Sequence, residues 1–348
     1  MQLRLSDTNV FEYLERHFPE ALGASGADRC VEAAGDGNIN WVRRVRAGDT
    51  SFIVKQAGPA LEKFPEYAVS PERLLHEERY FETAARFDTE NVIPMVHFVD
   101  PEHHVMVLED VGAAERLDTA WERGADTTEG LCRIAGFLAR VHRGTASHTE
   151  WLAPFPEPEH DDGVLRLHFD HIFRLPFDGT AFPLSPTVRA VADAVAADAK
   201  LRGAIAATEA ASHRPDALIH GDVQPTNILL APRGAVLLDA ETAHAGAPSF
   251  DLGILFAHVV IDCIAHGRVA DAPERIDPVW QAYLDGAEPL CAFDAVSKVA
   301  GVEMLRRTLG AAQVPAVSDD AVALEVVRVG RQLLLEASAG PDSLGEVA

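Results

Sequence analysis

The stretch LIHGDVQPTNILL, residues 218–230, is the part of the chain that decides how the rest is interpreted. Apolar residues flank a polar centre, a pattern that indicates a loop held between two short strands. His220, Gly221 and Asp222 begin this loop, and Asn227 follows the aspartate by five residues. Such a loop has two interpretations: it is a tight turn, or it is a place where a hydroxyl group and a metal ion meet.

The spacing of these residues is that of a kinase catalytic loop, H-x-D-x-x-x-x-N. In such a loop the aspartate accepts a hydrogen bond from the attacking hydroxyl, and the asparagine helps to hold magnesium. Asp222 is therefore the expected catalytic residue and Asn227 an expected metal ligand. Asp239 ends the apolar run AVLLD twelve residues later, and Glu241 follows it by two. Carboxylates suit Mg²⁺ bound to nucleotide phosphates, so we expect both to be metal ligands.

Each of these features alone favours a simpler structural explanation. An HGD tripeptide is commonly a turn with a capping aspartate, and an aspartate at a strand end is commonly a turn former. Their combination in this order, followed by PSFDLG at 248–253, favours the kinase interpretation.

The region before residue 110 has to supply the contacts to the nucleotide. Lys55 is the only lysine of the first sixty residues and lies in the apolar segment FIVKQ, so we expect it to point inward. A lone lysine there would favour an exposed edge strand, but the downstream motifs favour a contact with the α- and β-phosphates. A helical carboxylate usually holds such a lysine. Glu77 is the first candidate and Glu78 the second.

The loop that covers the phosphates should precede Lys55 by one hairpin. The segment GDGNINW (35–41) has this position but not the sequence G-x-G-x-x-G, so Gly37 and Asn38 are expected to supply the tight backbone. Taken alone, the segment would be an ordinary turn. The apolar connector VMVLEDV (105–111) is expected to contribute Glu109 to the nucleotide site.

Secondary-structure patterns divide the chain into two lobes. Residues 1–111 are rich in strand patterns, with a hairpin turning at Gly48 and Asp49 and helices expected at 8–22 and 71–87. Residues 112–348 are mainly helical, and the helical pattern at 185–208 is compatible with a break. We predict an α+β protein with a small β-rich N-lobe (1–111) for the nucleotide. The larger helical C-lobe (112–348) would carry the catalytic loop, the metal site and the acceptor site.

The composition limits the partners. The chain has 54 acidic and 30 basic residues, a net charge of −24, which argues against broad binding to nucleic acid or to an anionic membrane. A phosphate substrate would then require a local concentration of cations. No signal peptide or apolar run of transmembrane length is found, and the four cysteines lack metal-binding spacing. These features predict a cytoplasmic protein with reduced thiols.

The motifs resemble those of a known group of enzymes. LIHGDVQPTNILL followed by VLLDAET (236–242) is similar to the aminoglycoside phosphotransferase and choline kinase superfamily, which has a protein-kinase-like two-lobe fold. Within it, four segments look more like 5-methylthioribose kinases: DGNINWVRRV (36–45), FIVKQA (52–57), DAETAHAGAPSFDLGILFA (239–257) and GVEMLRRTLGAAQV (301–314). The resemblance covers roughly residues 30–335, in the order of the family.

The resemblance implies ATP and Mg²⁺ as cofactors and a sugar site that includes the twin arginines, Arg306 and Arg307. Consecutive helical residues point about 100° apart, so one arginine can reach the site while the other braces it. A guanidinium group near the transferred phosphoryl group stabilises its charge. The alternative is an exposed pair near the end of a helix.

The sequence also departs from this family. Methylthioribose kinases usually have HGDLHTGS where this chain has HGDVQPTN, so Asn227 stands at the position of a serine. The segment AGPALEKFPEYAVSPER (57–73) lacks the family's ALPYVRCVGESW pattern, and the region 150–215 is shorter than in the relatives. These differences keep the prediction of a kinase and widen the range of acceptors.

The leading prediction is an ATP-dependent kinase that phosphorylates a sugar hydroxyl, such as the 1-hydroxyl of 5-methylthioribose or a related pentose. An aminoglycoside or other small-alcohol phosphotransferase is the alternative. An acidic chain attracts a polycation, whereas two arginines in the site would repel it. A catalytically inactive nucleotide-binding regulator would have lost an expected residue, and all are present. The expected partner is a small molecule, and the sequence is compatible with a homodimer.

Overall fold

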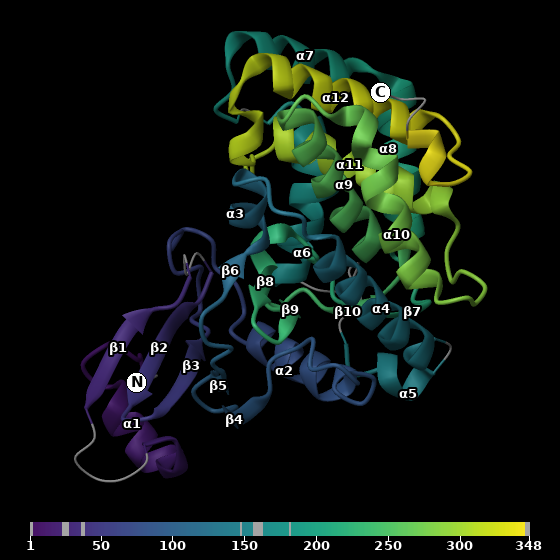
Figure 1. The fold of residues 1–348 in the computed structure, drawn as a ribbon. Coiled ribbons are helices and arrows are strands. Elements are labelled where there is room, and N and C mark those ends of the chain that lie inside the picture. Colours follow the sequence, from purple (N-terminus) through teal and green to yellow (C-terminus); the bar gives the residue numbers. More distant parts are fainter. Residues whose placement is uncertain are drawn as a thin grey trace.

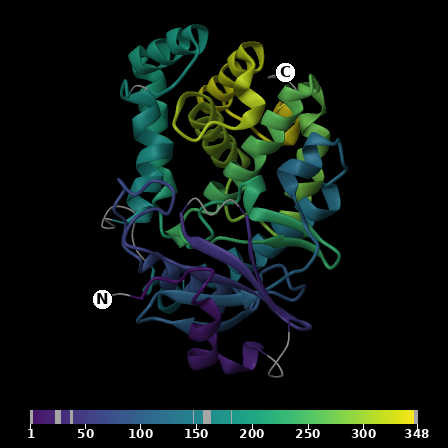
Figure 2. The same cartoon turned by 90° about the vertical axis from the view of Figure 1, so that its left-hand side faces the viewer.

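The chain forms a small lobe built on a sheet and a larger helical lobe (Figure 1). The computed structural model describes residues 3–22, 28–35, 39–146, 148–155, 163–180 and 182–344. Gly37 and Asn38, expected to cover the phosphates, lie outside the described residues. The view in Figure 2 shows the sheet at one end of the molecule and the C-terminal helices at the other. The predicted α+β architecture is confirmed.

The N-terminal lobe is a five-stranded antiparallel sheet with two helices. The strand order is β1-β2-β3-β5-β4. The elements are α1 (Val10–His17), β1 (Arg29–Ala33), β2 (Trp41–Ala47), β3 (Thr50–Gln56), α2 (Arg73–Ala84), β4 (Val96–Asp100) and β5 (Val105–Glu109). The β2–β3 hairpin has its turn at the predicted residues, because Ala47 pairs with Thr50 and Gly48 has a φ of +62°.

The first helix is shorter than the sequence pattern predicts. The helix α1 ends at His17, and a 3₁₀ turn at Pro19–Leu22 replaces its expected last part. Proline has no amide hydrogen to donate to the preceding helical turn, which explains the break.

Alternate residues of β5 serve two cores. Val105 and Val107 pack with α1 residues on one face of the sheet, whereas Met106 and Leu108 join the large core on the other face. The helix α2 lies on this second face, between the sheet and the helical lobe (Figure 1). The sheet is therefore held from both sides.

The C-terminal lobe contains the remaining helices and two small sheets. Its helices are α3 (Leu117–Glu122), α4 (Thr128–Thr145), α5 (Thr149–Leu152), α6 (Val164–Phe169), α7 (Pro186–Ala197), α8 (Ala199–Ser212), α9 (Ser249–Ala265), α10 (Ala272–Leu284), α11 (Phe293–Leu309) and α12 (Asp320–Leu335). Its strands are β6 (Glu115–Arg116), β7 (Ala217–Ile219), β8 (Ile228–Ala231), β9 (Gly234–Leu237) and β10 (His244–Gly246). The pattern at 185–208 is broken at Asp198, whose carboxylate caps α8.

The centre of this lobe is α9, which is buried from Ser249 to Ile264. It packs against α11, and α11 packs in turn against α12. Gly301 and Gly330 allow this second contact, since a Cβ atom at Gly301 would lie 2.5 Å from the carbonyl oxygen of Gly330. The helices α9, α11 and α12 therefore form a closely packed core of this lobe.

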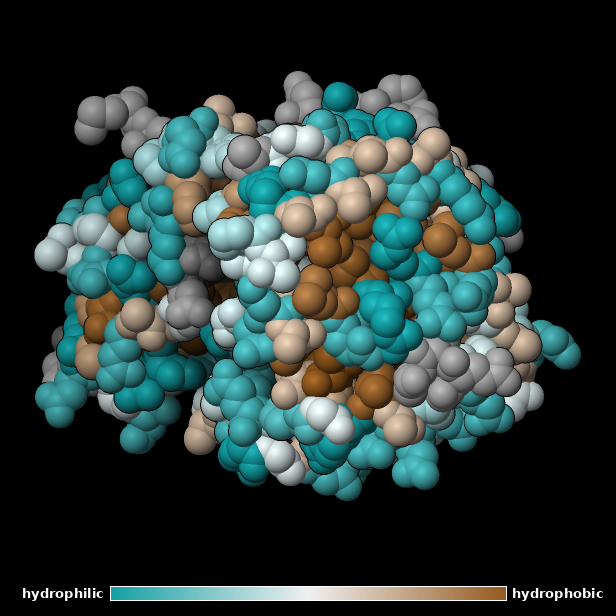
Figure 3. Space-filling view, turned by 90° about the horizontal axis from the view of Figure 1, so that it is seen from above, coloured by the Kyte–Doolittle hydropathy of each residue, from teal (hydrophilic) through white to brown (hydrophobic). Residues whose placement is uncertain are grey.

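The segment from Asp110 to Ala114 connects the two lobes, and we propose the division between residues 111 and 112 as their boundary. No helix among the described residues is long and apolar enough to cross a membrane. The surface seen from above is mainly hydrophilic, with a group of apolar side chains near the middle of the view and smaller apolar areas elsewhere (Figure 3).

Candidate active site

The loop after β7 is held in place by a buried aspartate of α9. Asp251 accepts hydrogen bonds from the backbone N–H groups of His220 and Gly221, both at 2.8 Å, and His142 of α4 lies 3.1 Å from the same carboxylate. Burial alone would raise the pKa of Asp251, but the contact with His142 holds it below its ordinary value. Gly221 has a φ of +84°, and a Cβ atom there would lie 2.4 Å from the carbonyl oxygen of Thr242. Only glycine fits this position.

Asp222 follows this anchor and has one carboxylate oxygen engaged. Its Oδ2 accepts hydrogen bonds from Asn227 Nδ2 at 2.9 Å and from Gln224 Nε2 at 2.7 Å. Its Oδ1 is buried and makes no hydrogen bond within the described part of the chain. A buried acceptor without a donor is unfavourable unless a ligand supplies one. The geometry suits a carboxylate that accepts a proton or a hydrogen bond from a substrate.

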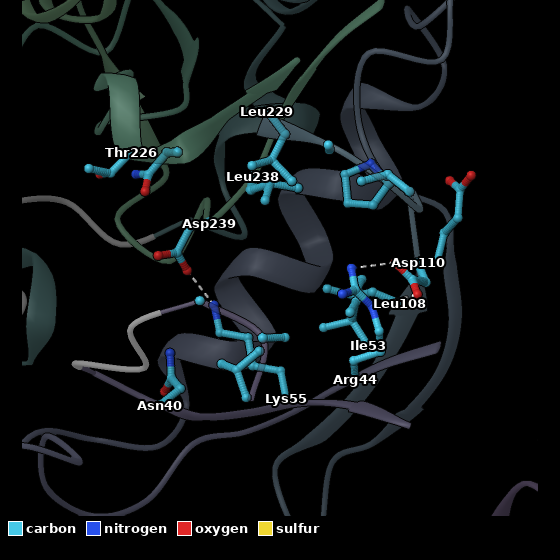
Figure 4. A pocket seen from close by; sticks show the side chains of 18 of the residues that line it. Asn40, Arg44, Ile53, Lys55, Leu108, Asp110, Thr226, Leu229, Leu238 and Asp239 are labelled. Atoms are coloured by element: carbon cyan, nitrogen blue, oxygen red, sulfur yellow. Dashed lines mark hydrogen bonds and ion pairs between the residues drawn. The ribbon is translucent and has the colours of Figure 1, made fainter. Parts of the chain in front are cut away.

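Lys55 lies in β3 and points from the sheet toward the catalytic loop (Figure 4). Its Nζ is 2.6 Å from Glu77 of α2 and also donates to Asp239, and the lysine is only 4% exposed. The structure thus brings Glu77, not Glu78, to Lys55. Burial would lower the pKa of Lys55, but the charges of Asp239 and Glu77 raise it instead. Burial raises the pKa of Glu77 to about 7, although Lys55 opposes the shift.

Asp239 has a left-handed backbone, with a φ of +68°, and its side chain is 37% exposed. Burial would raise its pKa, but Lys55 holds the pKa below its ordinary value. Asn227 and Asp239 line the same cavity as Lys55. Their oxygens are hard ligands of the kind that Mg²⁺ prefers, so these two residues fit a magnesium site.

Glu241 has other partners than the expected metal. It is 4% exposed, accepts a hydrogen bond from Asn40 Nδ2 at 2.9 Å and lies 3.5 Å from Arg73 Nε. Burial and the nearby charge of Asp239 raise its pKa. Arg73 also donates to the side chain of Asn40 and the carbonyl oxygen of Ile39, at 2.8 and 3.2 Å. Glu241 thus connects the loop after β9 to Asn40, in the described part of the expected phosphate-covering segment.

The cavity between the lobes has a volume of about 500 Å³. Its apolar lining includes Val42, Ile53, Phe81, Pro94, Leu108, Leu229 and Leu238. Glu109 lines it as expected, but its carboxylate is bound by Arg233 and by the backbone N–H of Met95 at 3.1 Å. An apolar slot beside Lys55 suits a nucleotide base whose phosphates reach the lysine.

The connector contributes a contact that the sequence pattern does not reveal. Asp110 accepts two hydrogen bonds from Arg44 of β2, at 2.7 and 2.9 Å, and one from Ser51 (Figure 4). Burial alone would raise the pKa of Asp110, but these donors lower it. The alternation in WVRRV predicts β2, yet no local signal pairs Arg44 with a residue sixty-six positions away.

Arg306 and Arg307 are buried, at 4% and 7% exposed, so the alternative of a surface pair is wrong. Both bind Glu303 of the same helix. Arg306 donates through Nε and Nη2, at 2.5 and 3.0 Å, and Arg307 through Nε at 2.7 Å. Burial alone would raise the pKa of Glu303, but the two arginines hold it well below its ordinary value.

The two arginines differ in their remaining contacts. Arg307 donates to Gln224 Oε1 at 2.6 Å and to the carbonyl oxygen of Ala312 at 3.3 Å, whereas Nη1 of Arg306 has no partner among the described residues. Arg307 therefore reaches the catalytic loop through Gln224. Neither arginine is among the described residues that line the cavity, so the expectation that one of them reaches the site while the other braces it stays a prediction.

The comparisons with known proteins place the fold in one class. A choline/ethanolamine kinase family protein from Mesorhizobium loti superposes with a TM-score of 0.54 at 18% identity, over 98% of this chain and 99% of that one. A spectinomycin phosphotransferase, solved with ADP and spectinomycin, gives 0.53 at 11% identity, over 95% and 98%. The class that these solved structures define for the chain is the protein-kinase-like fold.

The family is defined by sequence. The model of the phosphotransferase enzyme family matches residues 31–293, and the chain belongs to this family. A methylthioribose kinase from Erwinia tasmaniensis is 27% identical, with 90% of each chain aligned. Another from Pectobacterium atrosepticum is 28% identical, with 82% of this chain and 80% of the relative aligned. The chain is therefore a phosphotransferase, and its family implies the use of ATP.

Proposed function

We propose that this chain phosphorylates a sugar hydroxyl with ATP, and that the acceptor is the 1-hydroxyl of 5-methylthioribose or a related pentose. The observation that carries the proposal is the unpartnered Oδ1 of Asp222, on a loop anchored beside the cavity that holds Lys55 and Asp239. The relatives named methylthioribose kinase support the choice of sugar. The alignments cover 90% and 82% of this chain.

The chemistry assigned to these residues is an in-line transfer. Asp222 accepts the proton of the acceptor hydroxyl while the oxygen of that hydroxyl forms a bond to the γ-phosphorus of ATP. The bond from that phosphorus to the bridging oxygen breaks, and ADP leaves with its electron pair. Lys55 holds the non-transferred phosphates, and Glu77 keeps the lysine in place. Asn227 and Asp239 would hold Mg²⁺, which would neutralise phosphate charge.

We propose a different role for Glu241 from that of a metal ligand. Its hydrogen bond to Asn40 and its ion pair with Arg73 attach the phosphate-covering segment to the loop that carries Asp239. Binding of the nucleotide would then be coupled to the position of Asp239.

An aminoglycoside acceptor remains the second candidate, and one observation favours it more than the sequence did. Glu303 lies between the two arginines, so this buried group carries one net positive charge and not two. Its repulsion of a polycation is correspondingly weaker.

A screen of ADP release tests both candidates. Methylthioribose, ribose, other pentoses and a set of aminoglycosides are offered with ATP and Mg²⁺, and phosphorus NMR locates the new ester. Turnover on methylthioribose with a 1-phosphate product is the expected result. Turnover on aminoglycosides without turnover on any pentose would contradict the proposal.

A further inference from the structure

Gln224, two residues after Asp222, has both ends of its amide engaged. Its Nε2 donates to Asp222 Oδ2 at 2.7 Å, and its Oε1 accepts from Arg307 Nη2 at 2.6 Å. Arg307 is in turn held by Glu303 at 2.7 Å. A continuous chain of hydrogen bonds thus runs from the buried carboxylate of α11 to the carboxylate of the catalytic loop.

The orientation of the Gln224 amide is fixed by its two partners, Arg307 and Asp222. A guanidinium group can only donate, and an ionised carboxylate can only accept. The oxygen of Gln224 must therefore face Arg307, and its NH₂ group must face Asp222. Together with Asn227, which donates at 2.9 Å, Gln224 occupies Oδ2 of Asp222. The rotation of the carboxylate is thereby restricted, and the unpartnered Oδ1 is the oxygen left for a ligand.

We propose that Gln224 is a positioning residue for phosphoryl transfer. It holds Asp222 in the orientation that presents Oδ1 to the acceptor hydroxyl, and it connects that orientation to the Glu303–Arg307 pair. This inference rests on the proposed role of Asp222 and goes beyond it, since it names the donor that sets the geometry of the base. Gln224 lines the cavity, so it acts at the wall of the site.

A purely structural role would give Gln224 a different task. In that case its contact with Arg307 would only tie the loop to α11, and the donor to Asp222 would be incidental. The substitution Gln224→Glu separates the two roles. A glutamate has nearly the same shape and still accepts from Arg307, but it has no donor for Asp222 and adds a like charge beside it.

The first test compares steady-state kinetics of Gln224→Glu and Gln224→Ala with the wild type. A lost hydrogen bond to a charged group corresponds to about a tenfold to hundredfold loss of rate. We expect both variants to lose kcat by this factor, while the ADP dissociation constant stays near the wild-type value. The melting temperature should stay near the wild-type value for Gln224→Glu and fall for Gln224→Ala, which leaves Arg307 without this acceptor. Gln281→Glu is the matched control, since Gln281 donates to an aspartate carboxylate on the exposed face of α10, at 3.2 Å. Turnover of Gln224→Glu within twofold of the wild type would overturn the proposal.

The second test is a double-mutant cycle with Asp222→Asn. If Gln224 acts through Asp222, Gln224→Ala should cause no further loss of kcat in the Asp222→Asn background. A further tenfold loss there would show an independent role and overturn the proposal.

The design separates this inference from the identity of the acceptor. If the screen finds turnover on another alcohol, the proposal for methylthioribose fails. The steady-state comparison and the double-mutant cycle are then carried out with that alcohol as the acceptor. If no alcohol is phosphorylated, the slow transfer from ATP to water supplies the rate. Loss of that rate in Gln224→Glu supports the positioning role, and an unchanged rate contradicts it.

Discussion

The substitution Glu303→Gln would test whether the arginine pair depends on one buried carboxylate. Glu303 is 1% exposed and binds Arg306 through both of its oxygens, Arg307 through one, and lies 3.4 Å from His258. Glutamine keeps the shape of the side chain but removes the charge, and its NH₂ group would face donors. Two buried guanidinium groups would then lose the counterion that they share.

Removing one partner of a buried ion pair typically costs about 3–5 kcal/mol. We expect a loss of this size in the free energy of unfolding, because Glu303 serves two arginines at once. For a domain of 150–250 residues, this corresponds to a fall in melting temperature of roughly 10 °C. Since the pKa of Glu303 is depressed in the folded state, its contribution is present above the unfolded pKa of about 4.3 and is lost as the pH falls through the lower folded value. The difference between variant and wild type should shrink at strongly acidic pH.

The chain contains a matched control on α12. Glu325 and Arg328 form the same i,i+3 pair with the same two donors, at 2.6 and 2.9 Å, but their side chains are 37% and 45% exposed. An exposed pair contributes about 0–1 kcal/mol, so Glu325→Gln should change stability little. Thermal and urea unfolding of both variants, at pH 7 and at a strongly acidic pH, measure the difference. A Glu303→Gln variant within 1 kcal/mol of the Glu325→Gln variant would refute the reasoning.

The remaining predictions concern turnover. Asp222→Ala should lower kcat by several orders of magnitude with ADP affinity unchanged, as measured by steady-state kinetics and calorimetry. Asp239→Ala should abolish Mg²⁺-dependent turnover, and Asn227→Ser should be milder because methylthioribose kinases usually have serine there; equal losses would contradict this. On a sugar acceptor, Arg306→Ala and Arg307→Ala should each lose about one to two decades of kcat/KM, for roughly 1.5–3 kcal/mol per charge-assisted bond. The loss should fall mainly on KM for Arg306→Ala and mainly on kcat for Arg307→Ala, whose partner is Gln224. On an aminoglycoside, both substitutions should leave turnover intact or lower KM.

Local sequence patterns were sufficient to predict the fold class and to select polar side chains that line the cavity between the lobes. The spacing from His220 to Asn227 identifies the loop, since its function requires those residues within one short segment. Lys55 could be selected because the downstream motifs favour a phosphate contact over the exposed edge strand that a lone lysine would suggest. The choice between Glu77 and Glu78 depended on helix rotation, which only the packed structure provides.

The partners that position these groups could not be predicted, because they lie far apart in the sequence. Asn40 binds Glu241 across 201 positions, and Arg307 binds Gln224 across 83. A glutamate three residues before an arginine, such as Glu303, looks like an ordinary exposed helical pair. Because α11 is buried, Glu303 is instead a buried carboxylate that two arginines share.

The charges around the cavity also differ from the expectation that the site concentrates cations. Among its described lining residues the cavity has three cations and five carboxylates, namely Arg44, Lys55 and Arg116 against Glu77, Glu109, Asp110, Asp222 and Asp239. Each cation is paired with a carboxylate, so these side chains leave no net positive charge for the phosphates of ATP. Under the proposed function, a divalent cation held by Asp239 would supply this attraction, because it would reverse the sign of the local field. The acidic chain would then favour nucleotide bound together with its metal, and a neutral acceptor such as a pentose would avoid a further electrostatic cost.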